Sequence, residues 1–160
     1  MSIIEVAVSG DYLLKARKKA KELGSIKNSI TNGEGNLAGF LGELVVASKM
    51  KAKLYNTYDY DLIDPDGNRI DVKTKRCVSP PMPDYECSIA ATNIHQECDM
   101  YVFVRVLRVY TKAWILGKLS KDDYFKRATF HKKGSIDPAN KYTFKADCYN
   151  VKIKDLDNLS

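Results

Sequence analysis

Hydrophobic residues recur every three to four positions over residues 36–50, a period that is typical of a buried helix. The opposite side of this helix also carries small or apolar residues, so we expect it to be buried nearly all round. Glu43 is the one charged residue between Leu37 and Ser48. Burying an unpaired charge is costly, so Glu43 must meet a partner, either a metal ion or Lys73. The helix stripe is marked by Leu37, Phe40, Leu41, Leu44, Val45 and Ser48.

The pattern over residues 58–76 predicts a β-hairpin around one turn. Pro65 presets φ and Gly67 accepts a positive φ, so the chain reverses over residues 64–68. The flanking segments alternate between polar and apolar residues, which is typical of strands with one buried face.

Alternation along the two arms assigns each side chain to one face of a sheet. On the second arm, Asp71 and Lys73 share one face, while Val72 points to the other. On the first arm, Asp61 points away from the face of Leu62. A core position for both Leu62 and Val72 would therefore bring the three charged side chains together.

Two carboxylates on adjacent strands repel each other unless a cation lies between them, and Mg²⁺ or Mn²⁺ prefers such oxygen ligands. Lys73 would then orient or activate an attacking water, or stabilise charge on a phosphate. Taken alone, Asp71 and Lys73 are better explained as a solvated strand face with an ion pair. Asp59 shares the face of Asp61, and a shift of one pair in register would make it the ligand. We favour Asp61 because Leu62 then supplies its buried neighbour.

The rest of the chain predicts shorter elements. Residues 25–35 are rich in turn residues and should form a loop that orders on substrate, and residues 79–83 should form a loop because of their prolines. The expected strands cover residues 3–8, 51–55, 85–91, 100–109, 112–118, 142–144 and 148–153, and the expected helices cover residues 12–23, 93–97 and 120–128.

Composition narrows the function classes. The 160 residues are 44% hydrophobic and 29% charged, which is typical of one globular domain. No apolar run approaches the roughly 20 residues that span a bilayer, and no leader pattern is seen, so we expect a cytoplasmic protein without a membrane partner. Four cysteines without a CxxC pair, beside two histidines, predict free thiols rather than a zinc site. The net charge of +6 favours a polyanionic partner.

The order of these elements, with Glu43 on a helix, Asp61 on a strand and Asp71-Val72-Lys73 on the next, resembles the core of the PD-(D/E)xK nuclease superfamily. This resemblance implies an α/β fold in which a mixed β-sheet is flanked by helices. The restriction-endonuclease-like core, of order αβββαβ, would cover about residues 36–109. An accessory C-terminal hairpin and helix would cover residues 110–160 of a single nuclease domain spanning residues 1–160.

The resemblance also implies a role for each matching residue. Asp61 corresponds to the invariant aspartate, Asp71 to the second acid and Lys73 to the lysine. Glu43 corresponds to the upstream helix glutamate, and Gln96 to a glutamine that some members place after the core. The sequence departs from the usual pattern because no proline precedes Asp61 and because Asp71 stands where glutamate is more usual. Both departures preserve the oxygen ligands.

As a member of this superfamily, the protein would hydrolyse phosphodiester bonds in DNA and leave a 5′-phosphate. Asp61, Asp71 and the main-chain carbonyl of Val72 would hold Mg²⁺ or Mn²⁺, and Glu43 would bind a second metal or its water. Lys73 would orient or activate the attacking water.

Four basic residues are expected to contact the DNA backbone. They are Lys75, Arg76, Lys132 and Lys133. A Holliday-junction resolvase or another structure-specific nuclease is an alternative within the enzyme class, and a catalytically silent nucleic-acid-binding module is an alternative outside it. Cutting both strands of a duplex would favour a homodimer.

Overall fold

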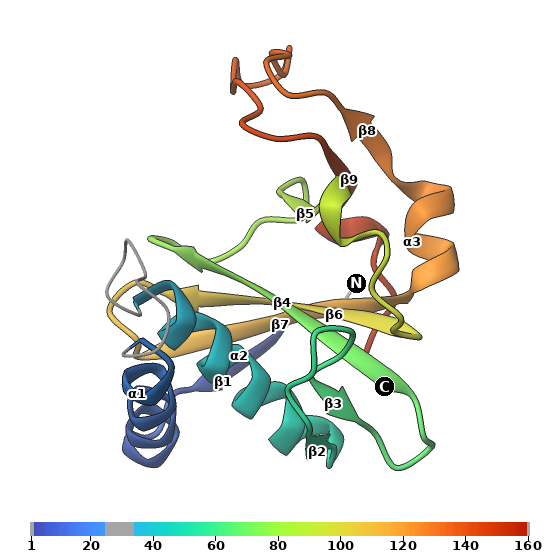
Figure 1. Ribbon diagram of the computed structural model, residues 1–160. Coiled ribbons are helices and arrows are strands. Elements are labelled where there is room, and N and C mark those ends of the chain that lie inside the picture. The colour runs from blue at the N-terminus through green and yellow to red at the C-terminus, as the bar shows by residue number, and fades with distance from the viewer. Residues whose placement is uncertain (1, 25–33, 160) are drawn as a thin grey trace.

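The computed structural model describes residues 2–24 and 34–159, which form a mixed α/β fold with two β-sheets (Figure 1). A curled six-stranded sheet has the order β1-β7-β6-β4-β3-β2, and β4 and β6 are its parallel pair. A three-stranded antiparallel sheet has the order β5-β9-β8. The strands are β1 Ile4–Ala7, β2 Lys53–Leu54, β3 Leu62–Ile63, β4 Arg69–Cys77, β5 Glu86–Ala90, β6 Met100–Leu107, β7 Lys112–Ser120, β8 Thr129–His131 and β9 Cys148–Lys152.

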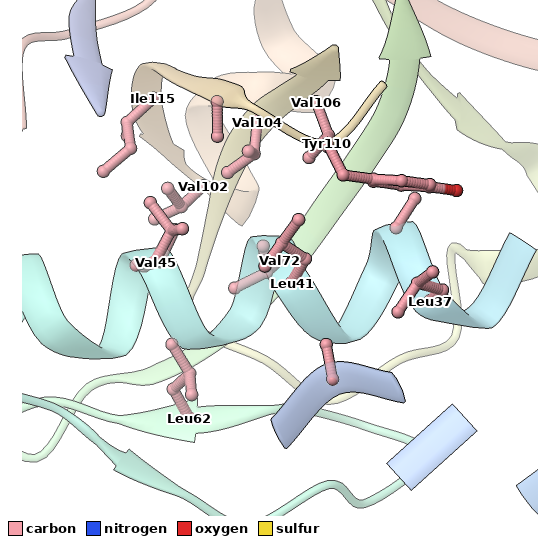
Figure 2. Close-up of a cluster of buried hydrophobic side chains, with 14 of the residues drawn as sticks. Leu37, Leu41, Val45, Leu62, Val72, Val102, Val104, Val106, Tyr110 and Ile115 are labelled. Atoms are coloured by element: carbon pink, nitrogen blue, oxygen red, sulfur yellow. The ribbon is translucent and has the colours of Figure 1, made fainter. Parts of the chain in front are cut away.

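Helices α1 and α2 cover one face of the six-stranded sheet. The helices are α1 Gly10–Gly24, α2 Glu34–Met50 and α3 Lys121–Arg127, and the 3-10 turns are η1 Ala91–Asn93 and η2 Ile153–Asp155. Helix α2 packs against the sheet and α1 packs beside α2, with Leu41, Val45 and Val72 among the buried contacts (Figure 2). The α2 helix is buried on most sides, as its sequence predicts, and Glu43 is only 6% exposed.

The small antiparallel sheet and α3 cover the opposite face of the six-stranded sheet (Figure 1). A second hydrophobic core lies there, built around Tyr101, Phe103 and Tyr124. The alternation of side chains along β4 therefore sends Val72 to the helical side and leaves Asp71 on the side of the small sheet.

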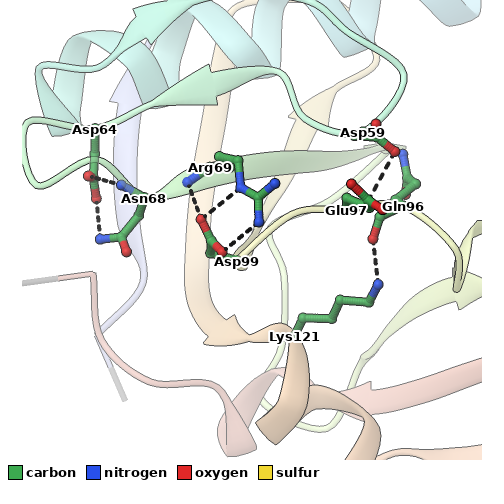
Figure 3. A network of polar contacts seen from close by, with 8 residues as sticks. All are labelled: Asp59, Asp64, Asn68, Arg69, Gln96, Glu97, Asp99 and Lys121. Carbon is green, nitrogen blue, oxygen red and sulfur yellow. Dashed lines mark hydrogen bonds and ion pairs between the residues drawn. The ribbon is translucent and has the colours of Figure 1, made fainter.

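The predicted hairpin forms around the predicted turn. Leu62 pairs with Ile70 across it, and Gly67 adopts a φ of 86°. Asp64 closes the turn because its Oδ1 accepts the main-chain N–H of Asn68 at 2.9 Å and its Oδ2 accepts the Asn68 side-chain amide at 3.0 Å (Figure 3). At the far side of the turn, Arg69 forms a two-pronged ion pair with Asp99, which joins the start of β4 to the segment before β6 (Figure 3).

Several predicted elements take a different form. The helix predicted over residues 93–97 is a 3-10 turn over Ala91–Asn93, so the order αβββαβ lacks its second α-helix. The strand predicted over residues 142–144 is a single bridge between Ile136 and Thr143. Of the predicted loop over residues 25–35, the last two residues belong to α2 and the others lie outside the described residues.

The segment assigned to an accessory region contributes to the main sheet. Strand β7 lies between β6 and β1, because its residues are apolar on both faces and are buried there. Strand β5, in contrast, pairs with β9 in the small sheet, since the proline-rich loop before it carries the chain away from β4.

The prediction of free thiols is confirmed. All four cysteines are free, and three of them are buried. No helix in the described ranges is long and apolar enough to cross a membrane.

Candidate active site

Asp61 lies in a bend just before β3 begins, whereas the sequence predicts it on the strand itself, and its carboxylate lies at the edge of β4. Its Oδ2 accepts the main-chain N–H of Val72 at 2.8 Å, and its own N–H donates to the carbonyl of Ile70 at 2.8 Å. Strand β3 is only two residues long, so no strand formed by residues 2–24 or 34–159 lies beside the β4 edge beyond Ile70 on this side. The Asp61 side chain takes the place of that strand.

The same geometry directs the carbonyl of Val72 towards Asp61. In a strand, the N–H and C=O of one residue point to the same side, and alternate residues share that side. Because the N–H of Val72 and the carbonyl of Ile70 both bond to Asp61, the Val72 carbonyl faces this edge as well. The Val72 carbonyl therefore faces the same edge as Asp61, as its expected role as a metal ligand requires.

Glu43 reaches the same place from α2. Its carboxyl group lies beside that of Asp61, and hydrogen bonding between the two shifts the pKa of both groups. Burial raises the pKa of Glu43, while the bond to Asp61 and the positive charge of Lys19 lower it. The partner of Glu43 is therefore Asp61, whereas the ion pair of Lys73 is with Asp71.

Burial and mutual repulsion hold protons on these carboxyl groups. Burial raises the pKa of Asp61 to about 7, and the charge of Glu43 adds to the shift. Burial also raises the pKa of Asp71 to about 7, against the lowering effect of Lys73, and the charge of Asp61 raises it further. Near neutral pH, the three carboxyl groups thus hold more protons than separated ones would.

Lys73 is held between Asp71 and Gln96. Its Nζ lies 2.7 Å from Oδ2 of Asp71 and donates a hydrogen bond to Oε1 of Gln96 at 3.0 Å. Gln96 is itself buried, and its Nε2 donates to the carbonyl of Tyr58 at 2.8 Å. The main-chain carbonyl of Gln96 accepts a hydrogen bond from Lys121 at the start of α3 (Figure 3). Lys73 therefore has a defined position.

Asp59 serves a different purpose from Asp61. Its Oδ1 accepts the main-chain N–H of Glu97 at 3.0 Å (Figure 3). It thereby fastens the loop before β3 to the segment that carries Gln96. The register of the hairpin brings Asp61, rather than Asp59, beside Asp71 and Glu43.

The donor atoms of this cluster suit a hard divalent cation. Carboxylate oxygens and a main-chain carbonyl are the ligands that Mg²⁺ and Mn²⁺ prefer. Oδ2 of Asp71 is buried, and its close contact is the ion pair with Nζ of Lys73 at 2.7 Å. As the side chains stand, no group of three His, Cys, Asp or Glu residues within the described ranges is spaced to hold a metal ion. The donor types fit a metal, and binding it requires the shared protons to leave.

The four basic residues lie in two places. Lys75 and Arg76 are exposed on β4, a few residues beyond Lys73. Lys132 and Lys133 are exposed after β8, in the arm that extends from the small sheet (Figure 1). The first pair lies on the strand of the carboxylate cluster, whereas the second pair belongs to another sheet.

Sequence reasoning missed the groups that hold Gln96 in place. The carbonyl of Tyr58 and the ammonium of Lys121 are its partners. Lys121 follows Gln96 by 25 residues, and nothing in its local pattern distinguishes it from any lysine in the first turn of a helix. The contact arises because β7 returns the chain to the start of β6.

A second pocket, of about 450 Å³, lies around the hairpin turn and is lined by Asp64, Asp66 and Met100 among others. None of Glu43, Asp61, Asp71 and Lys73 lines it, so the carboxylate cluster remains the candidate site. No known protein family model matches the chain, and no curated protein matches it either.

Proposed function

We propose that the protein is a divalent-metal-dependent DNA endonuclease that hydrolyses phosphodiester bonds. The observation that carries this proposal is the convergence of Glu43, Asp61 and Asp71 beside Lys73, where β3 and β4 separate. Clustered buried carboxyl groups destabilise a fold, so a protein that only needed the fold would be more stable without them.

Asp61, Asp71 and the carbonyl of Val72 would hold Mg²⁺ or Mn²⁺, with Glu43 as a further ligand. Bound there, the ion would stabilise negative charge on the phosphate and lower the pKa of the attacking water. Asp61 keeps its contact to the N–H of Val72 in this arrangement, which orients its second oxygen towards the cluster.

Lys73 would act on the attacking water or on a phosphate oxygen. Its ammonium has three N–H donors, of which one is directed to Gln96 and another towards Asp71. Because the ammonium of Lys73 contacts both Gln96 and Asp71, it is held at the edge of the carboxylate cluster. The net positive charge of the chain favours association with DNA.

The proposal includes a restriction-endonuclease-like core within the mixed α/β fold. A helix that carries a carboxylate, the β3–β4 hairpin and the parallel pairing of β4 with β6 are the elements expected of a restriction-endonuclease-like core. The crossover between β4 and β6 runs through β5 and a 3-10 turn instead of an α-helix.

Nicking of a supercoiled plasmid in Mg²⁺ tests the proposal. Wild-type protein should cut, whereas Asp71→Asn and Lys73→Ala should not. Asp66→Asn in the hairpin turn and Lys126→Ala on α3 change the same residue types at exposed positions and should leave cutting intact. Equal cutting by wild type, Asp71→Asn and Lys73→Ala would rule out the mechanism.

The alternatives have separate outcomes. A structure-specific nuclease would cut a flap or a four-way junction faster than linear duplex or single strand. A catalytically silent module would bind DNA and cut none of them in Mg²⁺ or Mn²⁺. A homodimer would show twice the chain mass in sedimentation and would cut both strands of a duplex in one encounter.

A further inference from the structure

A pocket of about 280 Å³ adjoins the carboxylate cluster on the side of the small sheet. It lies between β5 and the face of the six-stranded sheet formed by β4, β6 and β7. Its lining combines the positive side chains of Lys73, Lys75 and Arg105 with an apolar wall that includes Phe103 and Leu116, and Glu86 also borders it. Lys73 therefore borders both the pocket and the cluster.

Positive charge accumulates in this pocket because of the β4–β6 register. Lys75 on β4 and Arg105 on β6 are direct partners in the parallel pair. Lys75 is the next β4 residue after Lys73 on the same face. Like charges side by side on one sheet face destabilise it. A negatively charged ligand between them would reverse the sign of this interaction.

Arg105 is the deepest of these cations. It is only 8% exposed, and its Nη2 donates to the main-chain carbonyl of Glu86 at 3.1 Å. Its guanidinium carbon lies 5.3 Å from the ring centre of Tyr85. Within residues 2–24 and 34–159, no carboxylate forms an ion pair with it. A guanidinium has five N–H donors, so most of them are free for a ligand.

The carboxylate that borders the pocket is directed elsewhere. Oε2 of Glu86 accepts the side-chain amide of Asn150 on β9 at 2.8 Å. Glu86 therefore contributes its main-chain carbonyl to Arg105 and its carboxylate to the small sheet. A buried positive charge without a counter-ion is costly, and the cost would be offset by an anion supplied from outside.

We propose that this pocket binds a phosphate group of the nucleic acid, held by Arg105 and Lys75, next to the phosphate that is cut. The position of the second phosphate rests on the proposed nuclease function, because Lys73 borders both sites. Lys73 and Lys75 are two residues apart, about 6.6 Å along a strand. Arginine suits this role because its planar donors match two phosphate oxygens at once. An internal backbone phosphate and a terminal 5′-phosphate share this chemistry.

Binding of a 3′-labelled single-stranded DNA oligonucleotide, measured by fluorescence anisotropy in EDTA, tests the pocket without any cutting. Arg105→Gln should weaken binding about tenfold or more and reduce the slope of log K against log salt by about 0.7. Arg108→Gln removes the same charge at an exposed position outside the pocket and should change the affinity less than twofold. Binding by Arg105→Gln within twofold of wild type, or no binding by wild type, would overturn the proposal.

Two further measurements separate a structural role from binding. Excess inorganic phosphate should raise the Tm of wild type and of Arg108→Gln, but not that of Arg105→Gln. An equal rise in all three proteins would contradict the pocket. If Arg105→Gln does not fold, Lys75→Gln at the exposed wall should show the same loss of affinity, and an unchanged affinity there would overturn the proposal.

Three forms of DNA distinguish the source of the phosphate. A fivefold or larger preference for a 5′-phosphorylated over a 5′-hydroxyl oligonucleotide, lost in Arg105→Gln, assigns the pocket to a chain end. Binding of circular single-stranded DNA that depends equally on Arg105 assigns it to an internal phosphate. Arg105-dependent binding without plasmid nicking would refute the nuclease function alone, whereas nicking and binding that ignore Arg105→Gln would refute the pocket alone.

Discussion

The side chain of Asp61, the residue just before β3, accepts the main-chain N–H of Val72 on β4 at 2.8 Å. One carboxylate oxygen thus satisfies the N–H of Val72, and the same carboxyl group interacts with Glu43 and Asp71. The residue that repairs the edge of the sheet is the same residue that the proposed metal requires. Its two roles are separable by substitution.

Asp61→Asn keeps the acceptor for Val72 and removes the buried charge. We expect Asp61→Asn to unfold at a higher urea concentration than wild type at pH 8, because burial disfavours the ionised carboxyl group. Asp61→Ala also loses the hydrogen bond, and should be less stable than Asp61→Asn by about 1–2 kcal/mol. Asp59→Ala, which removes an exposed bond to Glu97, should cost less. Equal stability of Asp61→Asn and Asp61→Ala would show that the bond to Val72 contributes nothing.

Stability in EDTA should fall as the pH rises from about 5 to about 8. Asp61 and Asp71 have a pKa of about 7 in the folded protein, against an ordinary value of 3.8. Between these values the folded state holds more protons than the unfolded state, so the free energy of unfolding decreases with pH. The contribution is complete below the unfolded pKa and is lost as the pH passes the folded pKa.

Urea titrations at several pH values check this dependence. Asp71→Asn should flatten it, because one of the two carboxyl groups is then uncharged at every pH. Mg²⁺ should stabilise the wild type more at pH 8 than at pH 6, since binding displaces protons from its ligands. A free energy of unfolding that rises between pH 5 and pH 8 in EDTA would contradict the raised pKa values of Asp61 and Asp71.

Gln96 should act by positioning Lys73. Gln96→Met removes the acceptor at 3.0 Å from Lys73 Nζ at a similar side-chain volume, so we expect kcat for plasmid cleavage to fall about tenfold to a hundredfold. DNA affinity should stay within twofold of wild type. Glu97→Gln, an exposed neighbour, serves as the control. A loss of affinity with an unchanged kcat would place Gln96 in DNA binding instead.

The approach of α2 to β4 depends on Gly42. A Cβ at this position would overlap the side chain of Thr74, whereas a Cβ at Gly39 would meet nothing within 4 Å. Gly42→Ala should therefore destabilise the protein by about 1–3 kcal/mol, as overpacking does. Gly39→Ala should stabilise it by about 0.5–1 kcal/mol, the difference in helix propensity.

Thermal unfolding of the two glycine variants provides the comparison. Gly42→Ala should also lower the rate of plasmid cleavage, whereas Gly39→Ala should not, because Glu43 follows Gly42 and moves with the helix. Similar Tm values for Gly42→Ala and Gly39→Ala would mean that α2 is free to move away from β4 without cost.

Much of the secondary structure is predictable from local sequence patterns. The α2 helix, the turn after β3 and the long apolar strand β6 form where the sequence predicts them, because each depends on period, capping or turn chemistry within its own residues. The assignment of Asp61 to the face of Asp71 also followed from the two-residue period of strands. These features need no knowledge of distant partners.

Pairing between distant segments lay beyond the sequence. The period of β5 is the same whichever sheet it joins, and its partner is β9, about 60 residues away. For the same reason the sequence assigns residues 112–118 to an accessory region, whereas β7 pairs with β1 as well as with β6 inside the main sheet.

The chain by itself therefore determined which side chains could share a site: a carboxylate on a helix without other charge, and two aspartates and a lysine on one face of a hairpin. Tertiary structure decided how those groups are held. Lys73 is placed by Gln96, which Lys121 in turn holds, and the pocket beside Lys73 exists because parallel pairing of β4 with β6 puts Lys75 next to Arg105. The physical reason is that the face on which a side chain lies follows from the local period of its strand or helix. The groups that it contacts depend on how segments far apart in the chain pack together.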